Sequence, residues 1–144
     1  MACARMLRLG ALALALLVLG FGCRRSTVLH AVAGKVTYRG AALTNGIVVF
    51  TPDATRGESG PSAIGTIHED GSYSLNTGDA TGAGSGWYRV TVAAFTTPVP
   101  RTTMPAPPHS PLPVLPDKYR DPALSMLRCQ VKADQPNAID FNLD

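Results

Sequence analysis

The sequence predicts an all-β domain, a seven-stranded antiparallel β-sandwich. Short runs of alternating or β-branched residues recur along the chain, and each run is closed by Gly, Pro, Asn or Asp. No amphipathic stretch of useful helical length accompanies them. The 144 residues suffice for about one domain, and 14 Gly with 12 Pro argue against a long-helix protein. A charged fraction of only 16% argues against bulk disorder.

The strands are predicted from their alternation and from the turns between them. Tyr88, Val90 and Val92 alternate along the longest run, and Phe141 and Leu143 do so along the last. A Glu-Asp-Gly turn at 69–71 joins two runs as a hairpin. The seven predicted strands are 28–38, 46–51, 62–68, 72–76, 86–95, 125–133 and 138–143.

The segment 96–116 interrupts this pattern, because it holds eight of the twelve prolines. Proline lacks an amide donor and fixes φ, so this segment is predicted to be an extended, Pro-rich surface loop rather than a central strand or a helix.

Residues 1–22 are predicted to be an export signal. Arg5 and Arg8 precede an uncharged run of mostly Leu and Ala, and small residues then lead to Cys23. The apolar stretch is shorter than the ~20 residues that span a bilayer comfortably. A single-pass anchor remains an alternative, but a cleaved signal fits better.

The end of this segment, Leu19 to Cys23, resembles the lipobox of bacterial lipoproteins. The resemblance implies cleavage before Cys23 and attachment of a diacylglycerol to its thiol. Gly22 fits the small residue that the pattern requires, whereas Gly20 stands where Leu is usual and Phe21 is bulky. An ordinary signal peptide is the alternative. The predicted organisation is a lipoprotein signal peptide at 1–22, a tether at 23–31 and the sandwich at 32–144.

Charge and cysteine content limit the possible partners. Without Arg5 and Arg8, 11 of the 13 basic side chains remain against ten acidic ones, so the mature chain is nearly neutral and no nucleic-acid face is expected. With Cys23 acylated, Cys129 is left alone and is predicted to be a small buried residue. A Cys23–Cys129 disulfide is the alternative if Cys23 is not acylated.

Five segments together resemble the bacterial carboxypeptidase-regulatory-like domains, a branch of the transthyretin-like sandwiches. The likeness extends over about 33–143. It implies a non-catalytic domain, since in metallo-carboxypeptidases this domain is an accessory to a separate zinc domain that is missing here. The segments that carry the resemblance are 34–40, 46–50, 70–75, 86–92 and 115–119.

Few residues suggest chemistry, and no enzyme activity, metal or cofactor is expected. His30, His68 and His109 lie far apart in the sequence, without the spacing of a zinc site. Trp87 and Tyr88 are the candidate ligand contacts, because alternation at the start of a strand turns one of them outward, where it could stack on a sugar.

The sequence thus favours a lipid-anchored protein of the cell envelope, outside the cytoplasm, in the periplasm or on the cell surface. Its expected partners are the membrane through the anchor, and an envelope protein or glycan. The alternative is a carbohydrate- or small-ligand-binding module centred on Trp87 and the Pro-rich loop.

Overall fold

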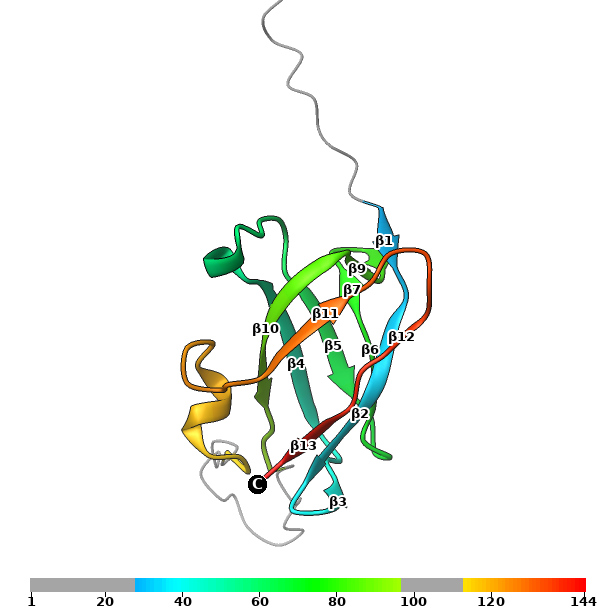
Figure 1. Cartoon of the computed structure of the whole chain (residues 1–144). Coiled ribbons are helices and arrows are strands. Elements are labelled where there is room, and N and C mark those ends of the chain that lie inside the picture. The colour runs from blue at the N-terminus through cyan, green and yellow to red at the C-terminus, as the bar shows by residue number, and fades with distance from the viewer. Residues whose placement is uncertain (1–27, 97–112) are drawn as a thin grey trace, which may run out of the picture.

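The computed structural model describes residues 28–96 and 113–144. Within these ranges the regular structure consists of β-strands and two short 3-10 turns, η2 (Ala54–Arg56) and η3 (Asp117–Arg120). Most strand pairs are antiparallel. The prediction of an all-β chain is therefore confirmed (Figure 1).

The larger sheet has six strands in the order β11-β10-β4-β5-β7-β8, and every pair in it is antiparallel. The predicted alternation holds, since Tyr88, Val90 and Val92 point into the core. The six strands are β4 (Gly46–Pro52), β5 (Ala63–Ile67), β7 (Asn76–Thr77), β8 (Ala80–Thr81), β10 (Gly86–Ala93) and β11 (Arg128–Val131).

A second sheet is built around β2 (Val32–Tyr38). This strand pairs antiparallel with β3 (Ala41–Ala42) and β6 (Ser72–Ser74), but parallel with β12 (Asn137–Ala138) and β13 (Phe141–Leu143). The expectation of an entirely antiparallel arrangement is therefore wrong for these two pairs. Alternation predicts which face of the sheet a side chain takes. The alternation is the same in parallel and antiparallel pairs, so it could not predict the direction of pairing.

The two sheets face each other across one aromatic core. The Phe50 ring on β4 lies 6.3 Å from that of Tyr73 on β6 and 5.9 Å from that of Phe141 on β13. It lies 5.8 Å from the ring of Tyr88 within its own sheet. Such edge and tilted contacts add to the apolar area that aromatic rings bury.

The predicted turn at 69–71 is present, but the predicted hairpin is wrong, because the turn passes the chain from one sheet to the other and the strands on its two sides do not pair. Gly71 donates to the His68 carbonyl at 2.9 Å, and β5 before the turn and β6 after it belong to different sheets. Gly71 has φ +80°, and a Cβ there would lie 2.8 Å from the Val36 carbonyl oxygen, so glycine fits best.

Regular structure begins earlier than the predicted domain boundary at residue 32. Leu29–His30 form β1, which pairs with β9 (Ala83–Gly84). The last part of the predicted 23–31 tether is therefore strand. Residues 1–27, with the signal and Cys23, lie outside the described residues, and no helix within those described is long and apolar enough to cross a membrane.

The two described ends of the Pro-rich segment are tied together at one end of β10. Phe95 forms a β-bridge with Pro113, and Val114 donates to the Ala94 carbonyl at 2.9 Å. Leu115 is buried in the core. The predicted loop 96–116 is thus anchored at its C-terminal end, whereas 97–112 lie outside the described residues.

Candidate functional site

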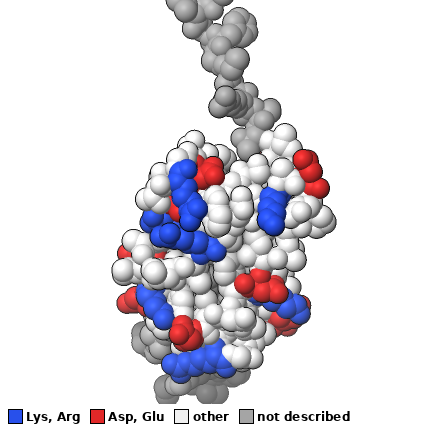
Figure 2. Space-filling view, in the orientation of Figure 1, with Lys and Arg blue, Asp and Glu red and all other residues white. Residues whose placement is uncertain are grey.

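Polar and cationic side chains gather where β4, η2, β10 and β11 meet. We call Arg56, Arg89 and Arg128, with Trp87 between them, the cationic corner. In the space-filling view, basic side chains cluster over this part of the molecule (Figure 2). Both η2 and β1 lie at the same end of the domain (Figure 1).

Asp53 organises the loop that forms this corner. It follows Pro52 at the end of β4 and caps η2, where its Oδ1 accepts from the Thr55 amide at 3.2 Å and from the Thr55 hydroxyl at 2.6 Å. Aspartate suits this position because its carboxylate satisfies amide groups left unpaired at the start of a helical turn. Gly57 then ends the turn with φ +79°.

The same carboxylate fastens the loop to β10. Arg89 Nε donates to Asp53 Oδ1 at 2.9 Å, and Arg89 Nη2 donates to Thr55 Oγ1 at 3.1 Å. The Asp53 side chain is only 1% exposed. The Thr55 hydroxyl, followed by Arg89, holds the pKa of Asp53 below its ordinary value, because these donors favour the ionised carboxylate.

Trp87 lies on the outer face of the larger sheet, half-buried, and its ring is covered by a cation. The Arg56 guanidinium carbon is 4.1 Å from the ring centroid, a cation–π contact. Arg56 Nε is also 3.7 Å from Asp53 Oδ2, and the backbone amide of Trp87 donates to Glu58 Oε1 at 3.1 Å. A sugar ring would have to displace Arg56 from this face before it could stack on Trp87.

Tyr88 takes no part in this surface, and its side chain is not placed to contact a ligand there. Its side chain is 5% exposed, and its hydroxyl donates to the Gly84 carbonyl at 2.9 Å. Burial also raises the pKa of the phenol. The expectation that one residue of the Trp87–Tyr88 pair faces outward is nevertheless confirmed.

The described residues that flank the Pro-rich segment lie away from Trp87, at the other end of β10. Trp87 is at the start of β10, whereas Thr96 and Pro113, which flank the segment outside the described residues, lie beyond its other end. Strand residues advance about 3.3 Å each, so some 30 Å of chain lie between Trp87 and Thr96. Trp87 therefore does not share a site with these flanking residues, and the predicted site at Trp87 and the Pro-rich loop depends on residues 97–112, which lie outside the described residues.

Arg128 completes the corner from β11. The strand register places it directly opposite Arg89. Arg89 is paired with Asp53, but within the described residues no ion pair or side-chain hydrogen bond involves Arg128. Arg128 therefore has no counter-charge among the described residues. The cation opposite it, Arg89, adds a repulsion, because like charges directly opposite each other weaken a strand pair.

Cys129, next to Arg128, points the other way and packs against the core. Its thiol is free and half-buried, and burial raises its pKa to about 12. The prediction of a core-packed cysteine fits this position. Cys23, the predicted lipid attachment site and alternative disulfide partner, lies outside the described residues.

Two other features carry less chemistry. A shallow hollow of about 390 Å³ on the second sheet is lined mainly by small and apolar residues, among them Ala31, Ala33, Tyr73 and Pro136. No group of three or more His, Cys, Asp or Glu within the described ranges is placed to hold a metal ion.

Sequence reasoning missed Asp53, Arg56, Arg89 and Arg128 as a group. The Asp53-x-Thr55 pattern after Pro52 is a recognisable helix-cap signal and could have located the turn. The pairing of Asp53 with Arg89 could not have been predicted from the sequence, because 36 residues separate them. No family model, curated protein or solved structure matches the chain.

Proposed function

We propose that this chain is a lipid-anchored protein of the bacterial cell envelope, and that its β domain is a non-catalytic interaction module. The acyl chains on Cys23 hold it to a membrane outside the cytoplasm, and the domain binds an envelope protein or glycan. We further propose that the two facing sheets form a seven-stranded, transthyretin-like sandwich of the carboxypeptidase-regulatory-like type.

The observation that carries the anchor is the Leu19–Cys23 pattern at the end of an apolar run. Stable anchoring needs two or more acyl chains, and a diacylglycerol supplies two. Leu29, the first residue of β1, is six residues beyond Cys23. Six extended residues reach about 20 Å, so the anchor holds the end of the domain that carries β1 close to the membrane.

The cationic corner supports binding rather than catalysis. The two carboxylates next to it hold the loop in place, since Asp53 Oδ1 accepts from Thr55 and Arg89, and Glu58 accepts from the Trp87 amide. The buried Asp53 Oδ2 has no hydrogen-bond donor among the described residues and faces Arg56 Nε at 3.7 Å. Both carboxylates serve as structural acceptors that hold the loop on β10. The groups left to meet a partner are the exposed Arg128 and the half-exposed Arg56.

Intact mass spectrometry of the full-length chain, extracted from the membranes of a bacterial host, tests the anchor. We expect an N-terminus at Cys23 that carries acyl mass, and a Cys23→Ser variant that is neither acylated nor cleaved there. Wild-type protein that is soluble, unacylated and indistinguishable from the variant would refute the lipoprotein proposal. In that outcome, a wild-type mass two hydrogens below that of the reduced chain would indicate the Cys23–Cys129 disulfide.

A further inference from the structure

One edge of β11 has no strand partner among the described residues, since this strand pairs only with β10. The Val90 amide donates to the Leu127 carbonyl at 2.9 Å, which identifies the positions that bond to β10. In an antiparallel pair the alternate residues, here Arg128 and Gln130, direct their N–H and C=O groups away from the partner. Such an unpaired edge is a template for another strand.

The next residue whose backbone groups point away from β10 is Lys132, and its N–H and C=O groups are hydrogen-bonded within the chain. The Lys132 amide donates to Asn137 Oδ1 at 2.8 Å, and Asn137 Nδ2 donates to the Lys132 carbonyl at 3.1 Å. The buried Asn137 thus takes the place of a neighbouring strand at residue 132. The open stretch is therefore short and well defined, from Arg128 to Gln130.

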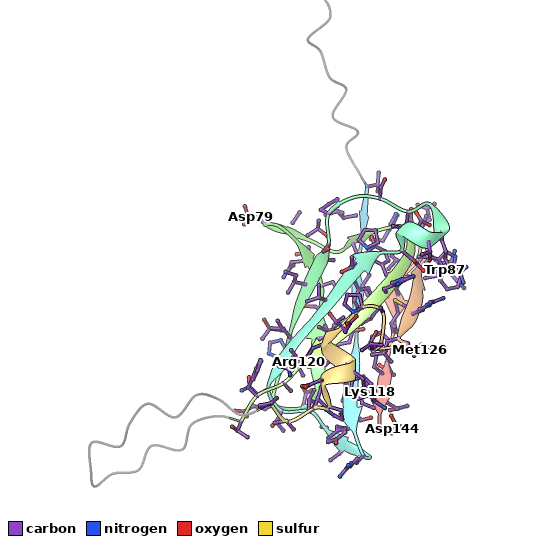
Figure 3. All side chains as sticks on the ribbon, turned by 90° about the vertical axis from the view of Figure 1, so that its left-hand side faces the viewer. Asp79, Trp87, Lys118, Arg120, Met126 and Asp144 are labelled. Carbon is purple, nitrogen blue, oxygen red and sulfur yellow. The ribbon has the colours of Figure 1, made fainter. Side chains whose placement is uncertain are left out.

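Exposed apolar side chains lie at the start of this edge. Met126 is 79% exposed and Leu124 is 60% exposed. Met126 also has φ +57°, a conformation that non-glycine residues seldom adopt. In Figure 3, β11 lies along the side of the domain that carries both Trp87 and Met126. Methionine adapts to irregular apolar partners, which suits a binding surface.

We propose that β11 binds an extended peptide segment of another protein as an added strand, with an acidic residue beside Arg128 and an apolar residue on Met126. The backbone of the segment pairs with Arg128 and Gln130, and its carboxylate supplies the counter-charge that Arg128 lacks. A second copy of β11 is a poorer occupant, because Arg128–Val131 contains no carboxylate. This inference rests on the proposed function and names the partner class of the interaction module.

Fluorescence anisotropy with detergent-extracted full-length protein tests the proposal. The probe is a fluorescein-labelled heptapeptide of threonine and valine with a central aspartate and a leucine two residues further on. We expect saturable binding of this peptide, and at least tenfold weaker binding of the same peptide with lysine at its centre. A peptide N-methylated on alternate amides loses binding, because it cannot pair with the strand edge.

Three variants locate the site. Arg128→Glu reverses the preference between the aspartate and lysine peptides, whereas Lys35→Glu, the same charge change on the second sheet, leaves it unchanged. Gln130→Pro abolishes binding of both peptides, because it removes an amide that points away from β10 and leaves the β10–β11 hydrogen bonds in place. Circular dichroism checks that each variant is folded.

Several outcomes would overturn the proposal. One is equal affinity of wild type and Arg128→Glu for the aspartate peptide. Another is a preference for phosphatidylglycerol over phosphatidylcholine vesicles that Arg128→Glu removes and Gln130→Pro does not reduce, which would assign the arginine to lipid headgroups. A dimer that Gln130→Pro dissociates would make a second copy the occupant. Failure of the anchor can be distinguished from failure of strand addition. An unacylated chain that binds the peptide refutes the anchor alone. An acylated chain that binds neither peptide refutes strand addition alone.

Discussion

Asp53 and Asp144 are held by similar partners in opposite surroundings. Asp53 accepts from the Thr55 hydroxyl and from Arg89, and its side chain is 1% exposed. Asp144 accepts from the Tyr119 hydroxyl and from Lys118 Nζ at 3.2 Å, and its side chain is 92% exposed. The first pair fastens a loop to β10 of the larger sheet, and the second joins η3 to Asp144.

Hydrogen bonding affects the pKa of both carboxyls in the same direction. The Thr55 hydroxyl is the main cause of the lowered pKa of Asp53, and the Tyr119 hydroxyl is the main cause for Asp144. Their burial differs, and burial decides what the loss of a partner does. Removal of the closer cation, Arg89, leaves Asp53 as a buried charge with only the more distant Arg56 beside it, whereas removal of Lys118 leaves a hydrated charge at Asp144.

The largest contrast is expected when each cation is removed. We expect Arg89→Met to lower the free energy of unfolding several times more than Lys118→Met, because the partner of Arg89 is a buried carboxylate and the partner of Lys118 is an exposed one. Urea denaturation followed by circular dichroism measures both. The double variant Asp53→Asn with Arg89→Met should recover part of the loss. Equal effects at Arg89 and Lys118 would show that burial does not separate the two pairs.

The pH dependence of stability should follow the same contrast. A lowered native pKa means that stabilisation is present above the ordinary carboxyl value of 3.8 and is lost as the pH falls through the native pKa. We expect Asp53→Asn to flatten the fall in unfolding free energy between about pH 5 and pH 2, and Asp144→Asn to flatten it less. Matching curves for wild type and Asp53→Asn would contradict this prediction.

A smaller effect is expected at the hydroxyl that serves Asp53. Thr55→Val removes a donor to the carboxylate and an acceptor for Arg89, but keeps the side-chain shape. We expect a loss of about 1 kcal/mol, the usual contribution of such a hydrogen bond. Thr55→Ser keeps the hydroxyl and serves as the control. Thermal unfolding of the two variants should therefore differ, and a Ser variant as unstable as the Val variant would refute a hydrogen-bond origin.

The smallest effect on stability is expected where Arg56 covers the Trp87 ring in the cationic corner. Arg56→Ala removes the guanidinium from the Trp87 ring, a contact of about 0.5–1 kcal/mol at an exposed site. Because Trp87 is the single tryptophan of the chain, its fluorescence reports this change directly. Acrylamide should quench the variant more strongly than wild type, with Arg120→Ala as the control, and unchanged quenching would mean that Arg56 does not shield the ring.

Short-range patterns in the sequence predicted the longer strands and their facing, but they missed the two-residue strands β3, β8 and β9. Each of the seven predicted ranges contains strand, and the alternation of Tyr88, Val90 and Val92 predicted their burial correctly. The turn at 69–71 was equally readable, because Asp-Gly turn chemistry is a property of a few adjacent residues. Of the candidate site the sequence predicted Trp87 and Tyr88, and only Trp87 lies on the outer face.

Local sequence patterns therefore established the all-β class, the positions of the longer strands and their inward faces, because side-chain period and turn preference act over a few residues. Tertiary structure alone decided the parallel pairing of β2 with β13, the Asp53–Arg89 pair and the placement of Arg128 opposite Arg89. These contacts join residues far apart in the chain, and they depend on strand order and direction. Period-two alternation is the same whichever strand lies alongside, so it carries no information about strand order or strand direction.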